Sequence, residues 1–154
     1  MRLIIFEDDA TYNFEPLTLT RGSFDLRLGI LSFSERTKHF TKADAVDFLA
    51  RDYIASHLSQ EKKVKSNEPD AIDDEALFFN GLLVFDSDLQ KKAKEMKPGT
   101  VVFKKGRLAM AKFGEAAAKE AARLLMGAPG AQAMRSIESM AIERQEYDGG
   151  LLIS

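Results

Sequence analysis

The chain has 154 residues, a formal charge of −2 at pH 7 and no cysteine. This length predicts one domain, residues 1–154, with a substantial hydrophobic core. The lack of cysteine excludes disulfides and thiolate metal sites. The near-neutral charge supplies no basic field for nucleic acid, and no apolar run reaches the ~20 residues of a membrane span. We therefore expect a cytoplasmic protein that binds neither nucleic acid nor membranes.

The first half of the chain begins with an apolar run at residues 3–6, which predicts a buried strand. This run leads directly into an acidic loop, Glu7-Asp8-Asp9. The elements expected next are, in order, a loop at 11–20, a helix with Ser32 or Ser34 as its N-cap, a strand at 45–49, a helix at 51–60 and a charged loop at 61–74.

The second half begins with a strongly apolar strand at 77–85, interrupted by Asn80-Gly81. The elements expected after it are a helix at 88–96 capped by Asp86-Ser87, a hairpin at 100–113 with a Lys105-Gly106 turn, a helix at 115–126 and a helix from 132 to about 145. This alternation predicts an α/β sandwich with a mostly parallel sheet.

The acidic loop and two arginines are the candidate functional residues near the N-terminus. A strand that delivers a polar loop is typical of ligand sites at the carboxyl edge of an open α/β sheet. Glu7, Asp8 and Asp9 fit a metal or ligand loop, but a solvated turn in which one aspartate caps the backbone is the favoured alternative. Arg21 and Arg27 fit phosphate contacts, or they pair structurally with Asp25 and the acidic loop.

Two later features also have competing interpretations. Glycine within a strand often marks close approach of a ligand or of other backbone, so Asn80-Gly81 is either part of a binding site or a plain bulge. The basic residues of the hairpin are expected to be ordinary solvent-exposed charges of its strands. They are Lys104, Lys105, Arg107 and Lys112. Phe78, Phe79, Met110 and Phe113 are expected in the core.

The stretch from residue 3 to 36 contains Pro16-Leu17-Thr18, Arg21, Leu28-Gly29 and Glu35-Arg36 after the first strand. This pattern resembles sugar nucleotidyltransferases of the N-acetylglucosamine-1-phosphate uridyltransferase-like kind, with their Pro-Leu-Thr, Arg-Pro-Lys and Glu-Arg motifs. Asn80-Gly81 is similar to an Asn-Gly in a central strand of a divergent branch of this family. The resemblance implies an abbreviated nucleotide-diphospho-sugar-transferase-like (Rossmann-like) sandwich.

The chain also departs from the family pattern at the phosphate loop. Asp9 and Thr11 stand where the family has glycines, Asn13 where it has an arginine and Ser23 where it has a lysine. Glycine lets backbone N–H groups approach phosphate, and lysine offsets its charge. The acidic loop would repel a triphosphate unless a cation such as Mg²⁺ stood between them, bound by carboxylates and phosphate oxygens.

The resemblance implies transfer of a nucleotidyl group from a nucleoside triphosphate to a sugar 1-phosphate. The residues then expected in the site are Arg21 and Arg27 as catalytic phosphate contacts, Thr18, Asn80 and Gly81 as substrate-binding residues, and Asp8 and Asp9 as Mg²⁺ ligands. The alternative is a non-catalytic nucleotide- or sugar-binding or assembly module on the same fold. Because relatives commonly continue into a left-handed β-helix, the resemblance implies an N-terminal domain, with a C-terminal β-helix domain as a missing partner. A homo-oligomer is the other expected partner arrangement.

Overall fold

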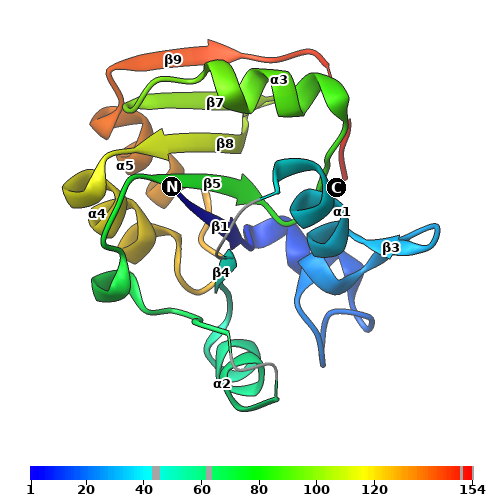
Figure 1. Cartoon of the computed structure of the whole chain (residues 1–154). Coiled ribbons are helices and arrows are strands. Elements are labelled where there is room, and N and C mark those ends of the chain that lie inside the picture. The colour runs from blue at the N-terminus through cyan, green and yellow to red at the C-terminus, as the bar shows by residue number, and fades with distance from the viewer. Residues whose placement is uncertain (43–45, 62–63, 150, 154) are drawn as a thin grey trace.

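The computed structural model describes residues 1–42, 46–61, 64–149 and 151–153, and its centre is a six-stranded mixed sheet (Figure 1). In sheet order the strands are β4 (Val46–Leu49), β1 (Arg2–Phe6), β5 (Ala76–Asn80), β8 (Arg107–Phe113), β7 (Thr100–Lys104) and β9 (Glu143–Glu146). β1 runs parallel to both β4 and β5, and β9 runs parallel to β7. β8 is antiparallel to its two neighbours, β5 and β7. The predicted α/β fold with a mostly parallel sheet is confirmed.

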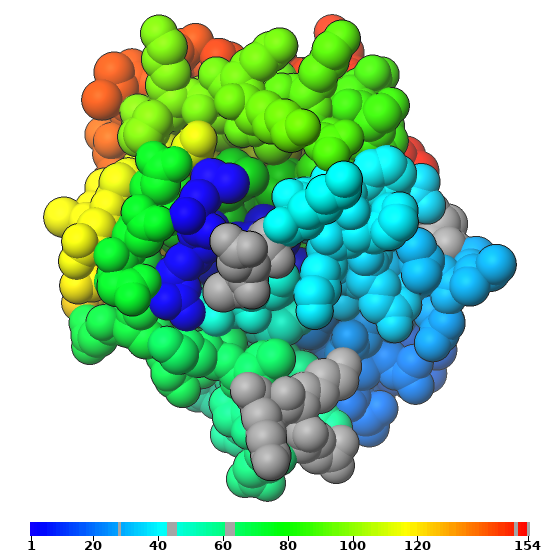
Figure 2. Space-filling model, in the orientation of Figure 1, coloured from blue at the N-terminus to red at the C-terminus, as the bar shows by residue number. Residues whose placement is uncertain are grey.

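Helices cover both faces of the sheet because its strands are apolar on both sides. In β1, Leu3 and Ile5 lie on one face and Ile4 and Phe6 on the other, and all four are at most 1% exposed. The first pair packs in one core cluster with α2 and α3, and the second pair packs in another with α4 and α5. The helices are α1 (Phe33–Thr41), α2 (Asp52–Glu61), α3 (Ser87–Glu95), α4 (Glu115–Leu125) and α5 (Ala131–Met140). In Figure 2, α1 in cyan and α3 in green lie side by side on the surface.

Local sequence signals fix several boundaries as expected. Ser32 is the N-cap of α1 and forms a full capping box with Glu35, and Asp86 caps α3. The β7–β8 hairpin turns at Lys105 and Gly106, whose φ angles of 50° and 76° fit the type I′ turn that matches strand twist. The four residues predicted for the core, Phe78, Phe79, Met110 and Phe113, are at most 1% exposed.

The prediction of a helix reaching residue 145 is wrong in its second half. α5 ends at Met140 and β9 follows. The backbone N–H groups of Ile142 and Glu143 donate to the carbonyl of Gly99, at 2.8 and 3.1 Å, and this draws the chain alongside β7. The β9 sequence is Glu-Arg-Gln-Glu, which has no apolar alternation, so tertiary pairing rather than local pattern makes this strand.

Other predicted boundaries shift by a few residues. The predicted loop at 11–20 begins within a 3-10 helix, η1 (Asp9–Phe14). Residue 45, the expected start of a strand, lies outside the described residues, as do residues 62 and 63 of the charged loop. The described part of that loop contains the 3-10 helix η3 (Pro69–Ala71) and a bridge from Ser66 to Phe48.

Two small ladders complete the fold beside the main sheet. β2 (Arg27–Leu28) pairs with β3 (Leu31–Ser32), and β6 (Leu83–Val84) pairs with β10 (Leu151–Leu152). The N–H of Ile153 also donates to the carbonyl of Leu82 at 3.0 Å. The last described residues therefore lie just past the carboxyl end of β5. None of the described helices is both long and apolar enough to cross a membrane.

Candidate functional site

Polar residues gather where the parallel strands β4, β1 and β5 end, at one edge of the sheet. Glu7 and Asp8 directly follow β1, Arg51 follows β4 after one residue, and Asn80 is the last residue of β5. β8 runs in the opposite direction, so its first residue, Arg107, lies at the same edge. Five charged or amide side chains from four strands therefore meet there, as expected for the carboxyl edge of an α/β sheet.

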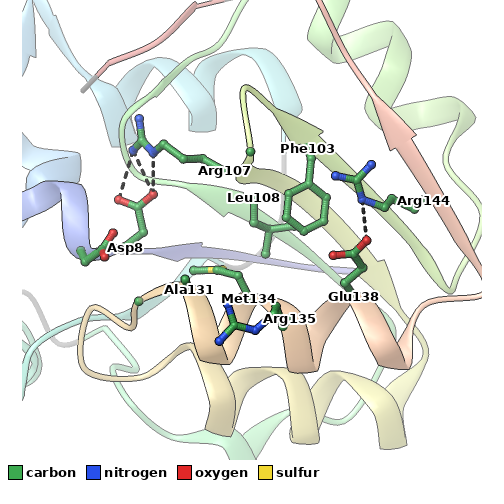
Figure 3. Close-up of a pocket in the computed structure, with 12 residues that line it drawn as sticks. Asp8, Phe103, Arg107, Leu108, Ala131, Met134, Arg135, Glu138 and Arg144 are labelled. Carbon is green, nitrogen blue, oxygen red and sulfur yellow. Dashed lines mark hydrogen bonds and ion pairs between the residues drawn. The ribbon is translucent and has the colours of Figure 1, made fainter.

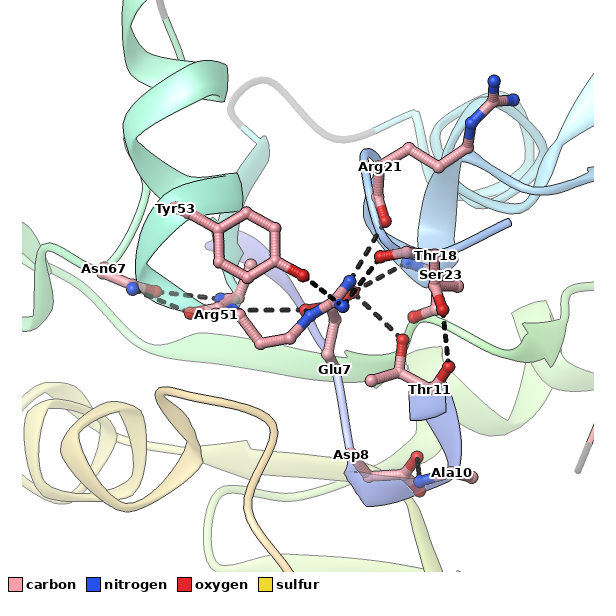
Figure 4. A network of polar contacts seen from close by, with 11 residues as sticks. Glu7, Asp8, Ala10, Thr11, Thr18, Arg21, Ser23, Arg51, Tyr53 and Asn67 are labelled. Atoms are coloured by element: carbon pink, nitrogen blue, oxygen red, sulfur yellow. Dashed lines mark hydrogen bonds and ion pairs between the residues drawn. The ribbon is translucent and has the colours of Figure 1, made fainter. Parts of the chain in front are cut away.

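Glu7 and Arg51 form a buried ion pair at this edge (Figure 4). Their side chains are 0% and 5% exposed, and Nη2 of Arg51 lies 3.0 Å from Oε1 of Glu7. Nε and the backbone N–H of Arg51 donate to Oε2, at 3.0 and 3.2 Å. Oε1 also accepts from the N–H of Ser23 at 2.8 Å. The carboxylate is thus fully enclosed by donors of the protein itself.

Arg51 also binds the loop that follows the acidic residues. Nη1 donates to the carbonyl of Thr18 at 2.7 Å and to the hydroxyl of Tyr53 at 2.8 Å, and Nη2 donates to the carbonyl of Arg21 at 3.0 Å. Burial disfavours the charged form of Arg51, but its bonds to Glu7 and the charge of Glu7 outweigh this and raise its pKa above the ordinary value. Arg51 therefore remains a cation and fastens the 18–23 loop to the sheet.

Asp8 is the centre of a second network. Nε and Nη2 of Arg107 donate to Oδ2 of Asp8 at 3.0 and 2.9 Å, and Nη2 also reaches Oδ1 at 3.1 Å. The amide of Asn80 donates to Oδ2 at 2.8 Å, and the N–H of Ala10 donates to Oδ1 at 3.1 Å. Nη1 of Arg107 donates to the carbonyl of Ile153 at 2.7 Å, which connects the network to the C-terminal strand.

A hollow of about 270 Å³ opens beside Asp8, between the β7–β8 hairpin and α5 (Figure 3). Phe103 and Leu108 from the hairpin and Met134 from α5 form its apolar lining. The remaining lining residues are charged or small: Asp8, Asp9, Gly106, Arg107, Gly130, Ala131, Arg135, Glu138 and Arg144. An apolar surface with a few polar groups is the usual composition of a small-molecule site.

The comparisons with known proteins give the family. A family model described as sugar nucleotidyl transferase matches residues 3–148. The chain belongs to the sugar nucleotidyl transferase family. Among solved structures it is similar to a Bacillus anthracis protein described as a glucose-1-phosphate thymidylyltransferase, determined in complex with sucrose. The TM-score is 0.58 at 12% identity, over 98% of this chain and 88% of that one, which is a likeness of fold. No curated protein sequence matches this chain significantly.

Within this sugar nucleotidyl transferase domain, the acidic loop is not the solvated turn that was favoured from sequence. Glu7 and Asp8 are 0% and 3% exposed, and each is neutralised by an arginine from another strand. Asp8 does cap η1 through the N–H of Ala10, so that part of the expectation holds. Asp9 is exposed, and a Cβ built on Gly130, the N-cap of α5, would lie 3.2 Å from its Oδ2.

The structure separates the predicted site residues into two groups. Asp8, Asp9 and Asn80 lie together near the hollow beside α5, whereas Arg21 and Arg27 are exposed and line a different hollow of about 340 Å³. Figure 4 shows the guanidinium of Arg21 pointing away from Glu7 and Asp8. Within the part of the chain that the structure describes, that guanidinium has no partner. Arg27 donates to the carbonyl of Ile30 at 2.6 Å.

The three expected substrate-binding residues are buried and packed against the protein itself. The hydroxyl of Thr18 donates to the carbonyl of Thr11 at 2.8 Å. The amide of Asn80 donates to both Asp8 and the carbonyl of Leu108, and its oxygen accepts from the N–H of Leu82. A Cβ on Gly81 would lie 3.1 Å from the carbonyl oxygen of Phe6, so backbone approaches closely there.

The two predicted Mg²⁺ ligands fit a cation unequally. Both oxygens of Asp8 already accept from Arg107, and its neighbours Ala10 and Asn80 fill the remaining positions. Asp9 has no hydrogen-bond or ion-pair partner in the described part of the chain. Among the described residues no three His, Asp or Glu side chains are grouped to hold a metal alone. Mg²⁺ usually needs only one or two carboxylates when phosphate oxygens complete its shell, so Asp9 fits and Asp8 does not.

Three arginines of the site were missed from the sequence, and of the hairpin charges expected to be exposed, Lys105 is exposed but Lys104, Arg107 and Lys112 are not. Arg51 follows a predicted strand, and the rule that placed Glu7 at the carboxyl edge applies to it equally. Arg107 was expected to be an ordinary exposed residue of the strand, but it is half-buried and ion-paired with Asp8. Lys104 and Lys112 are buried, and their ammonium groups donate to the carbonyls of Asp148 and Met96. No sequence signal marks Arg135, because only the fold brings α5 to this edge.

Proposed function

We propose that this domain transfers a nucleotidyl group from a nucleoside triphosphate to a sugar 1-phosphate. An oxygen of the sugar phosphate attacks the α-phosphorus, the bond from the α-phosphorus to the bridging oxygen of the β-phosphate breaks, and pyrophosphate leaves. The observation that carries the proposal is the Asp8–Asn80–Arg107 network beside an apolar hollow at the carboxyl edge, in a chain of the sugar nucleotidyl transferase family.

The chain's own residues divide the work in this proposal. Arg21 and Arg27 contact phosphates of the nucleotide from the second hollow, because guanidinium groups match phosphate geometry. Asp9 would hold Mg²⁺, and the ion would supply charge stabilisation at the phosphates. Asp8, Asn80, Gly81 and Thr18 shape the edge rather than contact substrate, because their polar atoms or backbone are occupied internally.

One observation favours a second candidate, a binding or assembly module without turnover. The buried Glu7–Arg51 pair lies beside the backbone of Arg21, and the guanidinium of Arg21 points away from Asp8. A reaction needs both substrates in contact, and a domain with two hollows that share no lining residue would bind ligands without joining them.

Turnover and binding measurements separate the two candidates. The purified chain is incubated with Mg²⁺, each of UTP, dTTP, GTP, CTP and ATP, and a panel of sugar 1-phosphates, and pyrophosphate and nucleotide sugar are quantified. Melting temperatures are recorded with the same ligands, since a ligand that binds the folded state raises them. Product from one combination supports the transferase. A ligand-dependent rise in melting temperature without product supports the module. The absence of both product and a rise in melting temperature rules out both candidates.

Arg21→Ala sharpens this test because the side chain is exposed and free of partners in the described residues. The transferase proposal expects it to lower turnover or nucleotide affinity at least tenfold while the melting temperature stays within about 2 °C, since exposed substitutions usually cost less than about 0.5 kcal/mol. Loss of stability without loss of binding would remove Arg21 from the site.

A further inference from the structure

We propose that Arg135 on α5 is the phosphate ligand of the sugar 1-phosphate, in the hollow between α5 and the β7–β8 hairpin. The proposal rests on the function proposed above and adds to it a residue and a place for one of the two substrates. It assigns phosphate binding to a helix in the last quarter of the chain rather than to the loop after β1, where the expected glycines and lysine are replaced.

Most of the charges around the hollow are paired with one another. Six charged residues line it, three acidic and three basic. Asp8 is paired with Arg107 at 2.9 Å, and Glu138 with Arg144 at 2.7 Å. Asp9 and Arg135 are left, and neither has a partner within the described part of the chain. An incoming ligand therefore meets one available cation and one available carboxylate.

One face of α5 is turned toward the hollow. Ala131, Met134, Arg135 and Glu138 all line the hollow, and their spacing of three and four residues places them on one face of the helix. Figure 3 shows the guanidinium of Arg135 lying along α5 toward Ala131, with no dashed line to any other side chain. The N-terminus of α5 itself is not the proposed phosphate site, because Oδ2 of Asp9 already lies against Gly130.

The size of the hollow fits a small sugar phosphate. Its volume of about 270 Å³ falls below the roughly 300–1,000 Å³ of sites for drug-sized ligands, so a hexose phosphate suits it better than a nucleoside triphosphate. A phosphate monoester carries about two negative charges, and one bidentate guanidinium offsets one of them while matching the phosphate geometry. Phe103 and Met134, which are 3% and 8% exposed, offer a small apolar surface for the sugar ring, and Asp9 can accept from its hydroxyls or share a cation.

The test compares Arg135→Gln with Lys91→Gln, a matched loss of one exposed positive charge on α3. Dissociation constants are measured by calorimetry for glucose 1-phosphate, N-acetylglucosamine 1-phosphate, mannose 1-phosphate and UTP. We expect Arg135→Gln to weaken the sugar 1-phosphate bound best by about ten- to a hundredfold, the effect of one charged hydrogen-bonding contact. UTP affinity should change less than twofold, and Lys91→Gln should match the unmodified protein.

Each other outcome overturns the assignment and identifies what failed. Equal loss of sugar phosphate and UTP affinity would mean that Arg135 serves the nucleotide or the fold. An unchanged dissociation constant would remove Arg135 from the site. A protein that binds UTP but none of the three sugar phosphates would contradict the assignment of the hollow as the sugar 1-phosphate site, while leaving nucleotide binding in place. Binding of neither substrate would refute the proposed function itself. Arg135→Lys keeps the charge but not the bidentate geometry. Its affinity for the sugar 1-phosphate should lie between that of the unmodified protein and that of Arg135→Gln.

Discussion

Replacing Arg51 with methionine should strongly destabilise the domain, because it leaves the carboxylate of Glu7 buried without its counter-charge. Glu7 is 0% exposed and receives three donor groups from Arg51; the substitution removes the two side-chain donors and leaves the backbone N–H. Removing one partner of a buried pair costs about 3–5 kcal/mol. For a chain of this size, that corresponds to a fall in melting temperature of roughly 6–20 °C.

Urea denaturation followed by far-ultraviolet circular dichroism measures this change, since the chain has no tryptophan. Arg123→Met is the control, because Arg123 forms an exposed pair with Asp70 at 2.6 Å, and such pairs contribute about 0–1 kcal/mol. Glu7→Gln combined with Arg51→Met should cost less than the two single changes added together, by about 1–3 kcal/mol. An Arg51→Met variant no less stable than Arg123→Met would refute the buried-pair argument.

Three further changes test other parts of the structure. Gly81→Ala should cost about 1–3 kcal/mol by overpacking, because its Cβ would lie 3.1 Å from the carbonyl of Phe6; an unchanged urea midpoint would contradict that close approach. Gly106→Ala should cost about 1–2 kcal/mol, since φ is 76° in the hairpin turn; thermal melting measures it, and no loss would argue against the turn type. Burial raises the pKa of Asp47 above 3.8 despite Arg2 beside it, so the folded state holds that proton longer and stability falls as pH rises past 3.8. The stability of the Asp47→Asn variant should not show this fall with rising pH. Identical pH profiles of stability for the variant and the unmodified protein would disprove the contribution of Asp47.

The sequence was sufficient for elements whose signals are local. The apolar run at 3–6, the Ser32 capping box and the Lys105-Gly106 turn each depend on residues close together in the chain, and the structure has all three. β9 was missed because its four residues are polar, and it exists only through pairing with β7. A strand whose stability comes from its neighbour leaves no periodic pattern to read.

The site was predictable only in part, for a related reason. The rule that ligand groups follow the carboxyl ends of parallel strands pointed to the acidic loop with Asp8, whereas Asn80 was singled out by the glycine beside it and by the family resemblance. The structure joins the two side chains by a hydrogen bond of 2.8 Å. Their partner Arg107 follows a hairpin turn, and it reaches this edge only because β8 inserts antiparallel between β5 and β7. Strand order is a property of the assembled sheet, so the pairing of Asp8 with Arg107 could not be derived from spacing.

These partners also change how the acidic loop should be understood. Read alone, Glu7-Asp8-Asp9 carries three negative charges where a phosphate would bind, and Coulomb repulsion argues against phosphate binding. In the folded chain two of the three are neutralised by Arg51 and Arg107, at 3.0 and 2.9 Å. Of the three carboxylates, only that of Asp9 has no partner among the residues that the structure describes. The local field therefore allows a phosphate near this edge, provided that an arginine such as Arg135 or a cation on Asp9 receives it. An acidic sequence at a phosphate site is compatible with phosphate binding when the fold supplies buried counter-charges.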